Sequence, residues 1–479
     1  MDSHRRDESA DEAVTRRNFL KRSPVAALPL AAVEAQGHAS PSSQEKPNVI
    51  LIISDQFRWD CLGANGQNPL NLTPNLDAMA AEGVNFANAI TNQPVCAPSR
   101  SCLFTSTYTN RHGVWRNGIA LSHDALTLAK VFRQAGYTAN YIGKWHLGNP
   151  AVAGPVAPED RGGFDDFWEG CNLMELTSHP YEGAMWDGEG RPIPFKGTYR
   201  VDFVTERVVR FLREKARAPF FLVISYLEPH FQNDCNCFVA PEGYAQRYRN
   251  SFIPEDLKFF PGDWQSQLPD YYGCIARVDE NVGKLRDEVA KLGLAANTTI
   301  AFVSDHGCHF RTRNSEYKRS GHEASIHIPT LMTGPGLRRS LAIKELVSQI
   351  DLAPTLLSAC GIAPPASFQG RSAMPLVERR VGWRNEVLVQ ISESMTGRAL
   401  RTPEWAYIVA EADGKSHASS PRYEEYQLYD LFADPHQLVN LAGRHETRDI
   451  SGQLRERLIA RIRESGEPPP EIQPRPLYP

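Results

Sequence analysis

Asn48-Val49-Ile50-Leu51-Ile52-Ile53-Ser54 is the stretch of this 479-residue chain that decides its fold. It is short, continuously apolar and rich in β-branched residues, which is the pattern of a strand buried on both faces of a parallel sheet. Residues 220–226 and 299–304 have the same character, and polar residues follow each of these runs. The sequence therefore predicts a largely parallel sheet whose strands end in polar side chains.

Helix-like segments separate the predicted strands. Residues 75–82 and 126–135 are two of them, and each stops at a glycine. Alternating strands and helices predict an α/β fold, with a large mixed, mostly parallel sheet sandwiched by helices. Ligands of such folds gather at the carboxyl ends of the strands, where we expect Asp55, His230 and Asp305 to meet.

The N-terminal part of the chain has the composition of an export signal. Residues 15–21 (Thr-Arg-Arg-Asn-Phe-Leu-Lys) match the twin-arginine pattern, and a short apolar run follows at residues 24–33. That run is shorter than the ~18 residues that a membrane span needs. We expect export by the twin-arginine machinery to the periplasm or beyond, without a membrane anchor; a disordered arm with a chance Arg-Arg pair is the alternative.

The character of the chain changes again beyond residue 380. Shorter alternating runs, such as residues 386–392 and 405–409, predict a smaller C-terminal antiparallel-sheet subdomain that ends in a helix over residues 450–465. The expected organisation is a removable signal over residues 1–40, a main domain over 46–380, an α+β subdomain over 381–465 and a proline-rich tail over 466–479.

Charge and cysteine content narrow the class of function. The formal net charge is -4 and the basic residues are scattered, so we expect no nucleic-acid partner. The nine cysteines are irregularly spaced in a chain long enough to fold on its core, which favours packing roles over a disulfide scaffold. For Cys235-Asn236-Cys237, a bridge to another segment and a metal site both stay open.

Cys96-Ala97-Pro98-Ser99-Arg100 is the most specific motif. By itself it could be a packed cysteine at a Pro-Ser turn, but it resembles the maturation signature C-x-P-S-R of sulfatases. Other stretches resemble that family in the same order: Pro47 to Asp55, Gly143 to Gly148, Glu228-Pro229-His230, Ser304 to Gly307, Lys318 to Glu323, Gly370-Arg371-Ser372 and Tyr429 to Pro435. On this basis the chain is identified as a member of the formylglycine-dependent sulfatases, of the alkaline-phosphatase-like superfamily.

The resemblance implies a role for each matching residue. A maturation enzyme would oxidise Cys96 to formylglycine, whose hydrate attacks the sulfur of a sulfate ester. The implied catalytic residues are Cys96, Arg100, Lys144, His146, His230 and Lys318. The implied metal ligands are Asp55, Gln56, Cys96, Asp305 and His306. Oxygen ligands with one imidazole suit a hard divalent cation, so we expect calcium before magnesium or manganese.

Three departures from the family pattern leave alternatives open. Gln56 stands where many relatives have an aspartate, Ser106 replaces a frequent glycine, and Arg313 replaces a frequent histidine. A glutamine at the first position also occurs in relatives that hydrolyse phosphonate monoesters or phosphodiesters, so such an enzyme is the first alternative. An inactive protein that binds sulfated glycans is the second.

The expected substrate is a sulfated carbohydrate or an aryl sulfate, selected by the loops over residues 150–198 and 231–272. Side chains in the first of these loops that could shape the rim of the pocket are Trp168, His179, Trp186 and Arg191.

Overall fold

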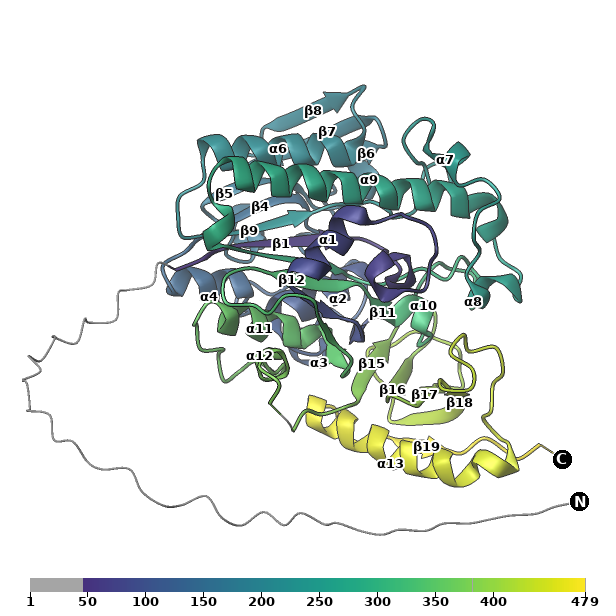
Figure 1. Ribbon diagram of the computed structural model, residues 1–479. Helices are drawn as coiled ribbons and strands as arrows, with labels where there is room; N and C mark the ends of the chain where they lie inside the picture. The colour runs from purple at the N-terminus through teal and green to yellow at the C-terminus, as the bar shows by residue number, and fades with distance from the viewer. Residues whose placement is uncertain (1–45, 381, 479) are drawn as a thin grey trace, which may run out of the picture. The chain divides into compact units, whose positions relative to one another are not determined.

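A mixed sheet of eleven strands forms the centre of the protein, which a computed structural model describes over residues 46–380 and 382–478 (Figure 1). Across the sheet the strands are β13 (Leu341–Ile343), β2 (Val84–Phe86), β12 (Thr330–Thr333), β10 (Thr298–Ser304), β1 (Asn48–Ser54), β9 (Phe220–Ser225), β4 (Thr138–Lys144), β5 (Phe167–Cys171), β7 (Glu182–Asp187) and β6 (Ser178–His179), with β8 (Pro192–Lys196) beside β7. The predicted export signal lies outside the described residues.

The centre of this sheet is parallel, and the pairs on either side of it are antiparallel except for the edge strand β13, which pairs in parallel with β2. β1 pairs in parallel with β9 and β10, and β4 pairs in parallel with β9 and β5. The three strands predicted from apolar runs are β1, β9 and β10, and they are neighbours in the sheet. The predicted α/β fold with a large mixed sheet is confirmed, and the carboxyl ends of these strands lie at one edge.

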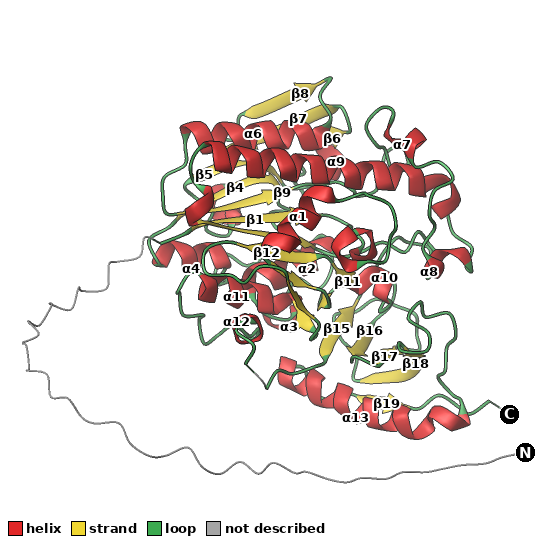
Figure 2. Cartoon of the chain, in the orientation of Figure 1, coloured by secondary structure: helices red, strands yellow, loops and turns green. Residues whose placement is uncertain are grey.

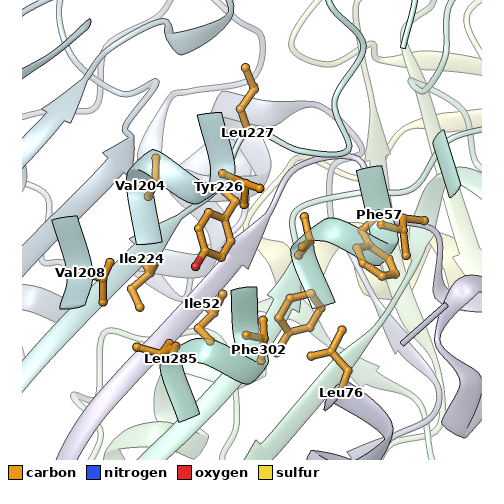
Figure 3. Close-up of a cluster of buried hydrophobic side chains, with 14 of the residues drawn as sticks. Ile52, Phe57, Leu76, Val204, Val208, Ile224, Tyr226, Leu227, Leu285 and Phe302 are labelled. Atoms are coloured by element: carbon orange, nitrogen blue, oxygen red, sulfur yellow. The ribbon is translucent and has the colours of Figure 1, made fainter. Parts of the chain in front are cut away.

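β1 is buried on both faces because alternate side chains join two different cores. Ile50 and Ile52 pack in one hydrophobic cluster, whereas Val49, Leu51 and Ile53 pack in another. Figure 3 shows the first cluster, where Ile52 lies among side chains of neighbouring strands and helices. Burying each such side chain stabilises the fold by roughly 1.5–3 kcal/mol.

Helices cover both faces of the sheet (Figure 2). α6 and α9 contribute to the cluster around Ile52, and α4 and α11 contribute to the cluster on the other face. The helices are α1 (Pro74–Glu82), α2 (Cys96–Thr105), α3 (Thr109–His112), α4 (Leu128–Gln134), α5 (Met174–Thr177), α6 (Arg200–Glu214), α7 (Tyr244–Arg247), α8 (Glu255–Lys258), α9 (Trp264–Lys291), α10 (Glu323–Ile326), α11 (Leu352–Ala359), α12 (Met374–Val377) and α13 (Arg448–Ser465). None of the helices in the described parts of the chain, residues 46–380 and 382–478, combines the length and the apolar character needed to cross a bilayer.

A second, five-stranded sheet forms the C-terminal part, as predicted. Its strands are β15 (Val387–Ile391), β16 (Gly397–Arg401), β17 (Trp405–Ala410), β18 (Arg422–Asp430) and β19 (Glu471–Gln473). The first four are antiparallel, but β19 pairs in parallel with β18. The proline-rich tail therefore supplies an edge strand, with Ile472 buried. The domain boundaries stay a prediction, because the described residues form one compact unit.

The loop that follows β10 is fastened to this C-terminal part. Arg313 donates hydrogen bonds to the carbonyl oxygens of His436 and Gln437, both at 2.8 Å. Arg401 of β16 forms an ion pair with Glu323, at 2.7 Å between Nε and Oε1. The position of the loop over residues 305–322, and of Glu323 directly after it, thus depends on residues 78 to 124 positions further along the chain.

Two smaller features complete the fold. β3 (Ala89–Ile90) lies between β11 (His327–Ile328) and β14 (Val347–Ser348) in a three-stranded sheet. Cys235 and Cys237 form a disulfide with each other. Neither option that the sequence left open for this pair is therefore found, since the bridge closes within the loop.

Candidate active site

Two carboxylates meet where β1 and β10 end. The parallel register places Ser54 opposite Ser304, so Asp55 and Asp305 leave adjacent strands at the same level. The backbone N–H of Gln56 donates to Asp305 Oδ1 at 3.1 Å. Both aspartates are fully buried, which is costly for charged groups unless cations accompany them.

Cys96 and Arg100 face these carboxylates from α2. Cys96 is the first residue of the helix, and Arg100 lies one turn later on the same face. The Arg100 guanidinium is fully buried and donates to Asp55 Oδ2 and Asp305 Oδ2, both at 3.2 Å. It also donates to Ser225 Oγ at 2.7 Å, so α2 is fixed against three strand ends.

Two lysines bring positive charge to the cysteine. Lys144 ends β4, and its Nζ lies 2.8 Å from Asp55 Oδ2. Lys318 comes from the loop after β10 and donates from Nζ to Cys96 Sγ at 2.8 Å. Burial raises the pKa of the Cys96 thiol, but Lys144 and Lys318 outweigh burial and hold that pKa well below its usual value. The site therefore favours an anion at this position.

Three histidines surround the same atoms. His306 Nδ1 lies 3.0 Å from the carbonyl oxygen of Gly307, which leaves the other ring nitrogen, Nε2, available as a ligand. Nε2 lies 3.4 Å from Cys96 Sγ. His230 Nε2 lies 3.4 Å from Lys318 Nζ. His146 has a left-handed backbone, with a φ of 66°, and its N–H donates to the Asn172 carbonyl oxygen.

The donor set fits a divalent cation. Ligand atoms of Asp55, Cys96, Asp305 and His306 all lie within 4.8 Å of one another, and all four residues are buried. Burial and the Asp55 carboxylate raise the pKa of Asp305, because two carboxylates this close repel each other until a cation lies between them. Gln56 lines the same cavity, but its Nε2 donates to Cys308 Sγ at 3.3 Å, and its role as a ligand stays a prediction.

Sequence reasoning missed Glu175, which the structure places in the site. Its Oε2 lies 3.1 Å from Lys144 Nζ, and its Oε1 lies 3.5 Å from His146 Nδ1. Burial raises the pKa of Glu175, but Lys144 and His146 outweigh burial and lower it to about 2. Glu175 belongs to α5, a single turn that no motif marks; only its position just past β5 could have indicated it.

A cavity of about 340 Å³ opens beside Cys96. None of the four side chains predicted for the rim lines it, and Trp168 is a core residue that stacks on Tyr141 with ring centroids 5.0 Å apart. The polar residues that do line the mouth are Asn117, Asn233, Asn236, Arg311, Glu316 and Arg319.

The other two departures from the family pattern lie behind the site. Ser106 ends α2 with a left-handed φ of 53°, a conformation that glycine adopts more readily. Its Oγ donates to the Ile350 carbonyl oxygen at 2.7 Å, which offsets part of the strain. Arg313 holds the C-terminal part and does not line the cavity around Cys96.

Comparisons with known proteins agree with this arrangement. The sequence model of the sulfatase family matches residues 47–362, and that of the C-terminal region of N-sulphoglucosamine sulphohydrolase matches residues 316–464. An ulvan-active sulfatase of Formosa agariphila is 29% identical over 445 residues, which cover 88% of this chain and 82% of that protein. An arylsulfatase of Clostridium perfringens is 29% identical over 494 residues, covering 88% of this chain and 96% of that protein.

A solved structure shows the same fold. The protein BT33494S-sulf from Bacteroides thetaiotaomicron superposes with a TM-score of 0.77 at 24% identity, covering 88% of this chain and 97% of that chain. The family match spans the strands that deliver Asp55 and Asp305 and the helix that begins with Cys96. The chain therefore belongs to the sulfatase family, within the alkaline-phosphatase-like superfamily, and is a sulfuric ester hydrolase.

Proposed function

We propose that this protein cleaves a sulfate monoester with formylglycine made from Cys96 and one divalent cation, which we expect to be calcium. The observation that carries the proposal is the position of Cys96 Sγ, which lies 2.8 Å from Lys318 Nζ and 3.4 Å from His306 Nε2. A side chain at this point contacts both the cation ligands and the groups that can hold an anionic ester.

The donor chemistry supports conversion of Cys96. A thiolate is a soft ligand, whereas the carboxylates of Asp55 and Asp305 suit hard cations such as calcium. Oxidation of the cysteine to an aldehyde, followed by hydration, would replace sulfur by oxygen and give a uniform hard set. The hydrate supplies one hydroxyl for attack on sulfur and a second that allows the sulfate to be expelled.

The remaining side chains can carry charge and protons. Arg100, Lys144 and Lys318 offset the negative charge that an anionic ester brings into a buried site. We assign His230, beside Lys318, to give a proton to the departing alcohol oxygen. We assign His146, beside Glu175, to take a proton during release of sulfate. Each transfer accelerates the reaction by roughly 10²–10⁴.

A sulfated carbohydrate is the substrate class that we favour, with an aryl sulfate as a simpler substitute. The ulvan-active relative supports the first class, and the arylsulfatase supports the second. The cavity beside Cys96 has mainly polar side chains at its mouth, which suits hydroxyl-bearing sugars.

Mass analysis of the peptide that contains Cys96, isolated from the native host, tests the nucleophile. We expect an aldehyde in place of the thiol. A cysteine that is never converted, in a protein that still binds sulfated glycans, would support an inactive binding protein instead.

Rates on an aryl sulfate and on the matching aryl phosphonate monoester test the reaction class. We expect the sulfate to react faster. A strong preference for the phosphonate would contradict the proposal and favour the alternative that Gln56 raised.

We also propose that the enzyme works outside the cytoplasm after export by the twin-arginine machinery. Replacing Arg16 and Arg17 together with lysine should retain the protein in the cytoplasm, as fractionation would show. Unchanged export would contradict this part of the proposal.

A further inference from the structure

Arg311 is held at the mouth of the cavity by a platform of aromatic rings. Its guanidinium carbon lies 4.6 Å from the centre of the Tyr317 ring and 5.7 Å from that of Phe231. Such contacts hold an arginine side chain flat while its N–H groups stay available at the edge. Phe310 and Arg311 both have left-handed backbones, with φ of 50° and 60°, a strain that persists only where surrounding contacts impose it.

The Cys235–Cys237 disulfide supports the same side chain. The residue enclosed by the bridge, Asn236, accepts a hydrogen bond at Oδ1 from Arg311 Nη2 at 3.0 Å. Asn236 itself has a left-handed φ of 52°. The bridge thus restricts the short segment that carries the acceptor, and through it the direction of the guanidinium.

The charge of Arg311 is less compensated than that of its neighbours. Arg319 also lines the cavity, but it forms ion pairs with Glu316 at 2.6 Å and with Glu393 at 2.5 Å. Arg311 Nε lies 3.5 Å from Asp263 Oδ2, an oxygen that already accepts a hydrogen bond from Tyr317 at 2.6 Å. Within the described residues, no shorter ion pair of Arg311 exists.

Arg311 and Lys318 line one cavity, together with Cys96 and His230. Lys318 contacts Cys96 and therefore serves the reacting group, whereas Arg311 stacks on Tyr317 and Phe231 and donates to Asn236. A cavity with two fixed cations, one inside and one at the mouth, suits a ligand with two negative groups.

We propose that Arg311, positioned by Asn236 and the Cys235–Cys237 disulfide, forms a second anion subsite. It would bind a further sulfate or carboxylate on the same substrate molecule whose ester is cut beside Cys96. This inference rests on the proposed function and names its substrate class more closely: a sugar chain with at least two anionic groups, rather than an isolated monosulfate.

Binding of three matched disaccharides to the Cys96→Ala protein tests the subsite without any need for turnover. One probe has a single sulfate, the second adds a carboxylate on the neighbouring sugar, and the third adds a second sulfate there. We expect at least one doubly charged probe to bind about ten- to hundredfold more tightly than the singly charged one by calorimetry. The two doubly charged probes distinguish a carboxylate from a sulfate.

Arg311→Gln, in the same background, should reduce that preference to within about twofold. Arg247→Gln is the matched control, because Arg247 also stacks on an aromatic ring, that of Tyr244 at 4.3 Å, but does not line the cavity. Asn236→Ala should lower the preference by a smaller factor, since it removes only the acceptor that directs the guanidinium. Equal binding of all three probes, no binding of any, or a preference that survives Arg311→Gln would overturn the subsite.

Failure of the subsite and failure of the proposed function are distinguishable. If the wild-type enzyme hydrolyses an aryl sulfate but the binding preference is absent, the subsite is wrong and the sulfatase chemistry stands. If the preference depends on Arg311 but no sulfate ester is cut by the matured enzyme, the subsite stands and the proposed function is wrong.

Discussion

Arg100 and Arg398 are both buried, with 0% and 1% of their surface exposed, yet they lie in very different regions of the molecule. In the C-terminal sheet, Arg398 pairs with Glu467 at 2.5 Å, one cation against one carboxylate. At the edge of the large sheet, Arg100 pairs with Asp55 and Asp305 and shares Asp55 with Lys144, beside Cys96 and an open cavity. Burial of charge therefore does not identify a site, whereas convergence of several charges on a cavity does.

The largest effect should come from Cys96→Ala, because it removes the proposed nucleophile and changes little else. We expect kcat/KM for an aryl sulfate to fall by at least about 10⁴-fold, while the thermal unfolding temperature stays close to that of the wild type. Turnover that persists at a tenth of the original rate would remove Cys96 from the mechanism. Cys102→Ala, one to two turns further along α2, is the matched control and should keep the activity.

Asp305→Ala should abolish cation binding and turnover together. We expect a loss of roughly 10³-fold in kcat/KM, because the proposed cation and the carboxylate that holds Arg100 would be lost at once. Metal analysis of the purified variant checks the cause. Full metal content with lost activity would show that Asp305 acts in another way.

Unlike the two previous variants, Arg398→Met should lower the stability of the protein and keep its activity. Leaving Glu467 buried without its cation should lower the free energy of unfolding by about 3–5 kcal/mol, as measured with denaturant. Turnover of the folded enzyme should stay within about twofold of wild type. Replacing Glu467 by Gln as well should recover much of the stability, and a loss of activity without a loss of stability would break the comparison between the two arginines.

Glu175→Gln should give the smallest change in free energy of these variants, because it keeps the shape of the side chain and removes only its charge. Lys144 still has Asp55 as a partner, so the fold should be kept. We expect kcat to fall by about ten- to hundredfold, with a smaller change in KM, since His146 loses the carboxylate beside Nδ1. A KM effect alone would assign Glu175 to substrate binding instead.

The sequence predicted the parts of the site that strands and motifs carry. The apolar runs of the sequence predict β1 and β10, and parallel strands bring the residues after them together, so the proximity of Asp55 and Asp305 follows from the sequence. Glu175 and Arg311 lie on a single helical turn and on an irregular loop, where no periodicity indicates what is near in space. The prediction that Trp168 lies at the rim of the pocket is wrong for a related reason. The sequence of a long segment does not distinguish an aromatic residue that packs in the core from one that faces a ligand.

The contacts of the loop after β10 have a consequence for the order of events during synthesis. Asp55 and Cys96 leave the ribosome early, but the loop that carries Lys318 is held by Arg401, His436 and Gln437, which are made near the end. A nascent chain therefore contains Cys96, the proposed nucleophile precursor, long before the loop that carries Lys318 can reach its final position. We expect this interval to give a modifying enzyme access to Cys96, which is only 1% exposed once the last strands are in place.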